Sequence, residues 1–504
     1  MTTMTQQARA DAGPVSRFAK WAPLAIVLCG TFIFVLDFFV VNVALPSIAR
    51  DLRAGAAAIE WLVSGYALTT AALLVTGGRL GDHYGRRRLF SIGLAVFVLA
   101  SALCAIAPDP SFLVAARVLQ GAGAGIMAPN ILAILGMTYT GPDRVRAISV
   151  YGIVMGLAAV SGQLVGGLLI DANVAGLGWR AIFWINVPIG LAALAATPRL
   201  LRESRAEHAG RLDLPGAALL AVALVAIVLP LVDGRQQGWP AWSWACLAAG
   251  PVLLAGFAVH LRRAARRGRQ PLLDPAIFAV PAFRAGLIVQ VLFWCQQAAC
   301  YLLLALFLQQ GRGLSPLASG GVFAVLAAGY LVTSLRAPAL TMRFGRRVIA
   351  TGAVVGAAGY LLVLLAVAHW GTGGPLDALF PGLFLVGAGQ GLCITPLTTT
   401  VLAHASPRTA GSVSGALSTA QQVGNAIGVA VSGVVFYGLL GHGYRAAFGS
   451  SVAQLGGLLL VVAVLALSLL RPATGASGAP GATGATGAAG AAGATGATGA
   501  TTEG

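Results

Sequence analysis

Three charged residues stand in long apolar runs of this 504-residue chain, although only 9% of its residues are charged. Asp37 and Arg117 lie within such runs, and Glu60 opens another. If the chain starts on the inside of a membrane, Asp37 is about nine residues below the outer end of its run and Arg117 about five, so their depths differ by about 6 Å. An ion pair between two helices is therefore feasible. Each charge left unpaired would cost about 3 kcal/mol or more in a bilayer.

Such a pair has two alternative roles. It can be a static salt bridge that holds neighbouring helices together. It can also couple transport to protons, because a carboxylate beside an arginine in an apolar interior takes up or releases a proton when its surroundings change. Asp37, Arg117 and Glu60 are the candidate proton-coupling residues, with a proton gradient and no bound cofactor as the energy source. The second half of the chain has no counterpart, since Asp377 stands at the very start of its run.

The apolar runs predict membrane-spanning helices. A mean hydropathy of +0.85 and a hydrophobic content of 58% exclude an ordinary soluble domain, and runs of about eighteen residues or more are long enough to cross a bilayer. Fourteen spans are expected, at residues 22–46, 60–78, 89–107, 112–137, 147–170, 181–198, 213–231, 243–261, 285–309, 317–336, 348–369, 376–402, 412–440 and 450–470.

The distribution of basic residues predicts the topology. With a cytoplasmic N-terminus and alternating spans, 25 of the 32 lysines and arginines fall in inside segments and six in outside loops, as the positive-inside rule requires. Topology and contact with anionic lipid therefore account for the net charge of +17, and no nucleic-acid partner is expected. We predict an all-α, multi-pass protein of a bacterial cytoplasmic membrane, monomeric, with both termini in the cytoplasm.

The loop between the second and third runs concentrates charge and glycine. It has the sequence GRLGDHYGRRR, residues 78–88, and its glycines suit a tight hairpin between two helices. Its arginines are explained as topology signals, but Asp82 opposes that signal. A carboxylate at a helix end can accept hydrogen bonds from the free N–H groups that open another helix, which predicts a conformational latch. The predicted latch residues are Gly78, Asp82, Gly85, Arg86 and Arg87, with Asp143 as a partner for Arg86.

Two weak repeats divide the chain into related halves. The basic loop recurs at 338–347 as PALTMRFGRR, and GAGAG at 121–125 recurs at 387–391 as GAGQG. Both repeats are offset by eight spans, which predicts two six-helix halves with two spans inserted between them. The predicted segments are an N-terminal segment 1–21, a six-helix bundle 22–198, an inserted pair 199–261, a basic linker 262–284, a second bundle 285–471 and a low-complexity tail 472–504 without stable structure.

Four motifs carry a resemblance to a known family. They are LDFFVVNVALP at 36–46, the loop at 78–88, RVLQG at 117–121 and WRAIFWINVPIG at 179–190. Together they resemble the major facilitator superfamily, and in particular its fourteen-span drug:proton antiporters. The resemblance implies the major facilitator fold of two six-helix bundles, here with two extra central helices. It also implies that Asp37 and Arg117 couple protons, and that Asp82 holds the first half against the helix that starts near Gly411.

The fifth run departs from the pattern of that family. The antiporter motif has Gly-Pro followed by a Gly-Gly pair, whereas this chain has Gly162-Gln163 followed by Gly166-Gly167. The glycines still allow close helix packing. Glutamine in place of proline removes the expected kink, which weakens the usual argument for export over uptake.

Polar, uncharged and aromatic residues are the candidates for a central substrate cavity. A lining of this kind suits bulky amphipathic molecules, which bind through ring contacts and a few hydrogen bonds. For each candidate, helix packing is an equal alternative. The candidates are Asn42, Tyr66, Asn130, Trp294, Gln296, Gln297 and Tyr301.

The function expected from these features is proton-coupled export of amphipathic small molecules, either drugs or a metabolite of the producer, by alternating access. An importer of a polar nutrient or siderophore is the alternative within transport, and a membrane sensor that does not transport is a more distant one. Lys20 is the only lysine, so the chain has no ATP-binding Gly-Lys-Ser/Thr motif. It also has no H-E-x-x-H, G-x-S-x-G or paired-carboxylate motif, so it is not expected to be an enzyme. Its six cysteines lack CxxC spacing, so no metal site is expected.

Overall fold

The computed structural model describes residues 17–205, 213–269, 271–402 and 410–468, and the regular elements in these ranges are all helices. The predicted tail 472–504 and most of the predicted N-terminal segment lie outside the described residues. The first bundle consists of α2 (Arg17–Asp51), α3 (Ala56–Tyr84), α4 (Arg86–Ala105), α5 (Pro110–Thr138), α6 (Gly141–Asp171), the short α7 (Ala181–Trp184) and α8 (Asn186–Leu200).

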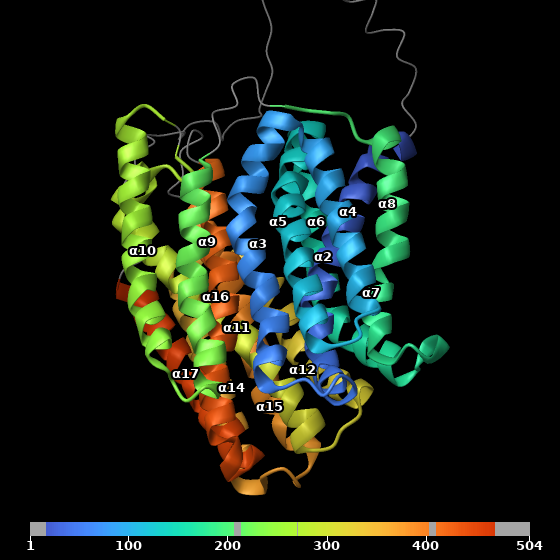
Figure 1. Cartoon of the computed structure of the whole chain (residues 1–504), viewed down its shortest axis with the longest axis vertical. Coiled ribbons are helices and arrows are strands. Elements are labelled where there is room, and N and C mark those ends of the chain that lie inside the picture. Colours follow the sequence, from blue (N-terminus) through green and yellow to red (C-terminus); the bar gives the residue numbers. More distant parts are fainter. Residues whose placement is uncertain (1–16, 206–212, 270, 403–409, 469–504) are drawn as a thin grey trace, which may run out of the picture. The chain divides into compact units, whose positions relative to one another are not determined.

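Along the sequence, two helices lie between the first bundle and the second. They are α9 (Leu214–Leu229), which ends in a π-turn at Pro230–Gly234, and α10 (Ala241–Arg266). Figure 1 shows α9 between α10 and α3, and these helices are in contact. The second bundle consists of α11 (Pro281–Leu306), α12 (Pro316–Ser334), the short α13 (Ala337–Phe344), α14 (Arg347–Trp370), α15 (Phe380–Leu402), α16 (Ala410–Leu439) and α17 (Tyr444–Ser468).

The helices are long and apolar enough to cross a membrane. Within the described residues, 13 helices meet this condition. The remaining predicted span, 147–170, coincides with α6, a helix of 31 residues. A helical membrane protein is therefore confirmed over the described residues, and each of the fourteen predicted spans falls on one helix or on two consecutive helical segments.

The glycines of the two GAG repeats occupy equivalent places in the two bundles. Gly121 brings α5 against α3, because a Cβ there would lie 2.5 Å from the Tyr66 carbonyl oxygen. Gly387 brings α15 against α12 in the same manner, since a Cβ at that position would lie 1.8 Å from the Leu326 carbonyl oxygen. In both bundles the repeat thus permits backbone-to-backbone contact between helices.

The two bundles meet mainly along two pairs of helices, α3 with α16 and α6 with α12, and α2 also contacts α11. At one end of the second pair, Asp171 accepts hydrogen bonds from the Ser315 hydroxyl (2.7 Å) and the Leu317 N–H (3.2 Å). Along the same pair, Gly167 has no room for a Cβ against the Pro316 carbonyl oxygen, at 2.5 Å. The bundles therefore touch directly at the end that the topology prediction assigns to the outside.

Candidate functional site

Asp37 of α2 and Arg117 of α5 form a buried ion pair between two helices of the first bundle. The Arg117 Nη1 atom lies 2.5 Å from the Asp37 Oδ2 atom, and the Arg117 and Asp37 side chains are 1% and 0% exposed. Asp37 and Arg117, which the sequence places at similar depths in the membrane, are thus in direct contact. A fully desolvated pair of this kind depends on both partners, because either charge alone would be buried without compensation.

Two amides complete the surroundings of the Asp37 carboxylate. The Gln120 Nε2 and Asn186 Nδ2 groups donate to Asp37 Oδ1 at 2.8 and 2.9 Å, and both amides also reach the Ser101 hydroxyl. Gln120 accepts from Arg117 through its other amide atom, at 2.5 Å. Gln120 and Asn186 were not among the predicted site residues, although Gln120 lies in the motif at 117–121 and Asn186 in the motif at 179–190.

The Arg117 side chain is held by further contacts on its other sides. Its Nε–H donates to the Leu62 carbonyl oxygen at 3.1 Å, and its guanidinium carbon lies 4.2 Å from the centre of the Tyr66 ring. The Tyr66 ring in turn contacts Phe38, at 6.5 Å between ring centres. The ion pair is therefore connected by ring contacts to Phe38, which lines the cavity described below.

Glu60 does not belong to this network. It is fully buried and pairs with Arg235, which follows the π-turn at the end of α9, with 2.8 Å between Arg235 Nη2 and Glu60 Oε1. The Arg235 guanidinium carbon lies 4.8 Å from the centre of the Tyr437 ring on α16. Glu60 therefore forms a second buried pair, at the place where α3, α16 and the inserted helices meet.

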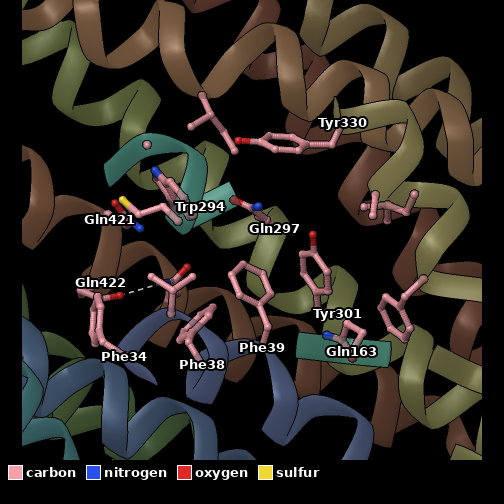
Figure 2. A pocket seen from close by; sticks show the side chains of 18 residues that line it. Phe34, Phe38, Phe39, Gln163, Trp294, Gln297, Tyr301, Tyr330, Gln421 and Gln422 are labelled. Carbon is pink, nitrogen blue, oxygen red and sulfur yellow. Dashed lines mark hydrogen bonds between the residues drawn. The ribbon is translucent and has the colours of Figure 1, made fainter. Parts of the chain in front are cut away.

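A cavity of about 280 Å³ lies between the two bundles. Figure 2 shows the rings of Phe38, Phe39 and Tyr301 beside one another along it; the Phe38–Phe39 ring centres are 5.3 Å apart and the Phe39–Tyr301 centres 5.2 Å apart. The described lining contains no charged side chain. Its aromatic members are Phe34, Phe38, Phe39, Trp294, Tyr301, Phe323 and Tyr330, and its amide members are Gln163, Gln297, Gln421, Gln422 and Asn425.

Three of the seven predicted cavity residues line this cavity: Trp294, Gln297 and Tyr301. The other four have packing roles, which the sequence analysis left open as an alternative. Tyr66 stacks on Arg117, and the amides of Asn42 and Asn130 donate to backbone carbonyls. Gln296 accepts a hydrogen bond from the Tyr360 hydroxyl at 2.7 Å. A side-chain amide inside a bundle can bond to its own or a neighbouring backbone, and residue type alone does not distinguish these uses.

The phenylalanines of α2 and the amides of α16 also line the cavity, although they were not among the residues predicted from the sequence. Phe38 and Phe39 directly follow Asp37, so α2 presents the carboxylate to one side and aromatic rings to another. Gln421 and Gln422 lie on a segment that the sequence identifies only as apolar. The available signal was the clustering of amides at 421–425 within an apolar run.

The glycine-rich loop has contacts that differ from the prediction. Asp82 pairs with Arg86 at 2.7 Å, within the loop itself. Asp143 pairs with Lys20, also at 2.7 Å, and is therefore not the partner of Arg86 in this structure. The side chains at the start of α16, where Asp82 was expected to act, lie outside the described residues, so the latch stays a prediction.

The start of α4 is capped by a residue from a distant part of the chain. Glu203, which follows α8, accepts hydrogen bonds from the backbone N–H groups of Arg87 (3.0 Å) and Arg88 (3.2 Å). Gly85 has φ of 112° and a Cβ there would lie 2.6 Å from the Glu203 carboxylate. An anion at a helix N-terminus is a favourable arrangement, and Gly85 is needed both for its conformation and for its lack of a side chain. Gly78 of the same loop packs on Pro129, with 3.4 Å from a Cβ to the proline ring.

Comparison with known proteins identifies the class of this chain. The family model described as Major Facilitator Superfamily matches residues 27–429. The chain is 39% identical to the "Probable actinorhodin transporter" of Streptomyces coelicolor, over 85% of this chain and 75% of the relative. It is 35% identical to the "Puromycin resistance protein pur8" of Streptomyces alboniger, over 90% and 92%, and 36% identical to the "Cephamycin export protein CmcT" of Amycolatopsis lactamdurans, over 81% and 84%.

Solved structures agree with this assignment at the level of the fold. A crystal structure of a POT family transporter in complex with 5-aminolevulinic acid matches with a TM-score of 0.65 and 13% sequence identity, over 88% of this chain and 95% of the other. The chain therefore belongs to the major facilitator superfamily. It is a multi-pass transporter of small molecules in a bacterial cell membrane, with relatives among drug and antibiotic efflux proteins.

Proposed function

We propose that this chain exports amphipathic small molecules in exchange for protons, by alternating access of the cavity between its two bundles. Relatives named for transport of actinorhodin and export of cephamycin favour export over uptake. The chemistry of the cavity favours amphipathic cargo, because rings and amides line it and no charged side chain does so within the described residues. Proton exchange is the energy source in this proposal.

The observation that carries proton coupling is the composition of the network around Asp37. Its carboxylate accepts hydrogen bonds from Arg117, Gln120 and Asn186, and all three groups are donors. A carboxylate is acceptor-only, whereas a protonated carboxyl carries an O–H that needs an acceptor. The network as it stands therefore fits the anion. A proton on Asp37 would displace at least one donor and leave Arg117 without its counter-charge.

The consequence of protonation reaches the cavity through two rings. Arg117 rests on the Tyr66 ring, and Tyr66 contacts Phe38 in the cavity lining. A shift of the Arg117 guanidinium would therefore change how Tyr66 packs on Phe38. In this mechanism, proton uptake by Asp37 biases the relative position of α2 and α5, and substrate in the cavity biases the same helices from the other side. The two events are coupled because they act on one packed element.

Transport into everted membrane vesicles tests the proposal. The probe is the neutral dye 1,4-dihydroxyanthraquinone, and an inside-acid gradient is imposed. Wild-type vesicles are expected to accumulate the dye against its gradient, and a protonophore is expected to abolish the accumulation. Asp37→Asn should remove uphill accumulation, because the residue can no longer exchange a proton, but should leave dye binding within about threefold of wild type.

Asp377→Asn is the matched control, since it neutralises an exposed carboxyl outside the network. It is expected to transport like the wild type. Uphill accumulation by Asp37→Asn at the wild-type rate would refute the coupling role of this residue. Proton-driven accumulation in right-side-out vesicles instead of everted ones would refute export.

A further inference from the structure

Gln163 of α6 lines the cavity but has no hydrogen-bond partner for either end of its amide. Its side chain is 2% exposed, and both its Nε2 and Oε1 atoms are buried without a partner among the described residues. A buried amide without partners destabilises a protein, and an apolar side chain of similar volume would avoid that cost. The unpaired amide therefore indicates that a ligand supplies its hydrogen-bond partners.

Close helix packing fixes the position of Gln163. On one side, Gly162 and Gly166 bring α6 against α2, where a Cβ would lie 2.9 Å from Phe39 and 2.7 Å from Val40. On the other side, Gly320 of α12 leaves only 2.7 Å from a Cβ to the Gln163 carbonyl oxygen. The backbone of Gln163 is thus clamped between two helices from different bundles. Packing against both helices fixes the position of Gln163 in the cavity lining, as a specific binding group requires.

Several aromatic side chains stand near Gln163 in the cavity lining (Figure 2). Phe39 contacts Tyr301, and the Tyr301 ring stacks on Phe323 with 5.6 Å between ring centres and 5° between ring planes. Figure 2 shows Gln163 next to Tyr301 in this part of the cavity. Parallel rings beside an unpaired donor and acceptor fit a flat molecule that carries its own acceptor and donor side by side at its edge.

We propose that Gln163 determines substrate specificity, and that the cavity selects uncharged, planar, polycyclic aromatic molecules with a ring carbonyl next to a hydroxyl or N–H group. The Gln163 amide donates to the carbonyl and accepts from the neighbouring group, while the ring system stacks among the aromatic side chains. Cations are disfavoured, because the described lining offers no carboxylate to pair with them. This inference rests on the proposed export function and adds the substrate class to it.

Equilibrium binding to the purified full-length chain in detergent micelles tests the inference without any gradient. The probes are 1,4-dihydroxyanthraquinone, which carries adjacent carbonyl and hydroxyl groups, anthracene, which carries none, and ethidium, which is a planar cation. Gln163→Leu should weaken binding of the dihydroxyanthraquinone about 10- to 30-fold, the loss expected for two hydrogen bonds in a desolvated site. Anthracene binding should change less than about twofold.

A second variant at the same position is expected to strengthen binding of one probe instead of weakening it. Gln163→Glu keeps the shape of the side chain and adds a carboxylate to the cavity, so ethidium binding should rise about tenfold or more. Gln290→Leu is the matched control. Gln290 is a buried glutamine of α11 that does not line the cavity, and its replacement should change binding of no probe.

Three results would overturn the inference: equal losses for both neutral probes in Gln163→Leu, wild-type binding of ethidium as tight as that of the dihydroxyanthraquinone, or no binding of either neutral probe. Failure of the proposed function is a separate outcome. If binding depends on Gln163 but wild-type vesicles do not accumulate the dye, export is wrong and the binding site stands. If vesicles accumulate the dye equally with wild type and Gln163→Leu, only the specificity role is wrong.

Discussion

Removal of Arg235 should destabilise the protein in a way that depends strongly on pH. Arg235 supplies the cation that contacts Glu60 Oε1, and the second carboxylate oxygen, Oε2, has no hydrogen-bond partner among the described residues. Gly433 of α16 faces the same carboxylate, where a Cβ would lie 2.5 Å away. Next to this pair, the Trp61 Nε1–H of α3 donates a 3.0 Å hydrogen bond to Asp233 of the inserted segment. Water has little access to a carboxylate in this position.

Without Arg235, Glu60 can either stay charged and unpaired or take up a proton. The cost of each state gives the expected loss in the free energy of unfolding. Breaking a buried ion pair costs about 3 to 5 kcal/mol. Protonating the glutamate instead costs about 4 kcal/mol at pH 7 and about 1 kcal/mol at pH 5, starting from the reference value for a free side chain. Glu60 will adopt whichever of these two states costs less free energy, and that cost sets the loss of stability. Arg235→Leu should therefore lower the free energy of unfolding by about 3 to 4 kcal/mol at pH 7 but by only about 1 kcal/mol at pH 5.

Denaturant titration of the purified protein in mixed micelles at the two pH values measures this difference. The double variant Glu60→Gln, Arg235→Gln removes both charges and should recover most of the stability lost at pH 7. Arg445→Leu removes an exposed arginine whose guanidinium contacts the Ala368 carbonyl, and it should cost about 0.5 kcal/mol. A loss below about 1 kcal/mol for Arg235→Leu at pH 7, or a loss of the same size at pH 5, would refute the reasoning.

Two further predictions concern stability. Burial raises the pKa of the Asp213 carboxyl, but hydrogen bonds from His260 and from two backbone N–H groups outweigh burial and hold that pKa below its usual range. Asp213 therefore stabilises the protein at neutral pH, and thermal midpoints of wild type and Asp213→Asn should converge as the pH falls below about 4. Gly387→Ala should cost about 1 to 3 kcal/mol, because its methyl group would meet the Leu326 carbonyl; Gly457→Ala, with no atom within 4 Å, should be neutral or stabilising in the same melting assay.

The fold and the main ion pair could be predicted from the sequence because both depend on simple quantities. The spans follow from the length of apolar runs, and the Asp37–Arg117 contact follows from depth, since charges at similar depth in neighbouring helices have few other partners in lipid. Depth does not determine which helices are neighbours. Glu60 is near the same predicted outer surface, yet its partner Arg235 comes from the inserted pair, whose position no repeat in the sequence indicates.

The cavity could be predicted only in part, for a related reason. Rotation of a helix about its axis decides whether a side chain faces a cavity or a neighbouring helix, and apolar runs with glycine give little information on rotation. Tyr66 was expected in the cavity but faces Arg117. Gln163 was noted only as a replacement for proline, and its place in the lining depends on the glycines of α6 and α12, which set the distance between those helices.

The described cavity lining, which contains no charged side chain, has a consequence for the energetics of the proposed exchange. If the proposed exchange moves one neutral molecule out for each proton that enters, each turnover carries one positive charge into the cell and is therefore electrogenic. A membrane potential of about 100 mV then contributes about 2.3 kcal/mol per turnover, enough to sustain a concentration ratio of about 50-fold without any pH difference. Exchange of a monovalent cation for one proton would gain nothing from the potential. Under the proposed exchange, the protein would keep pumping at alkaline external pH, where the chemical gradient of protons vanishes but the voltage remains.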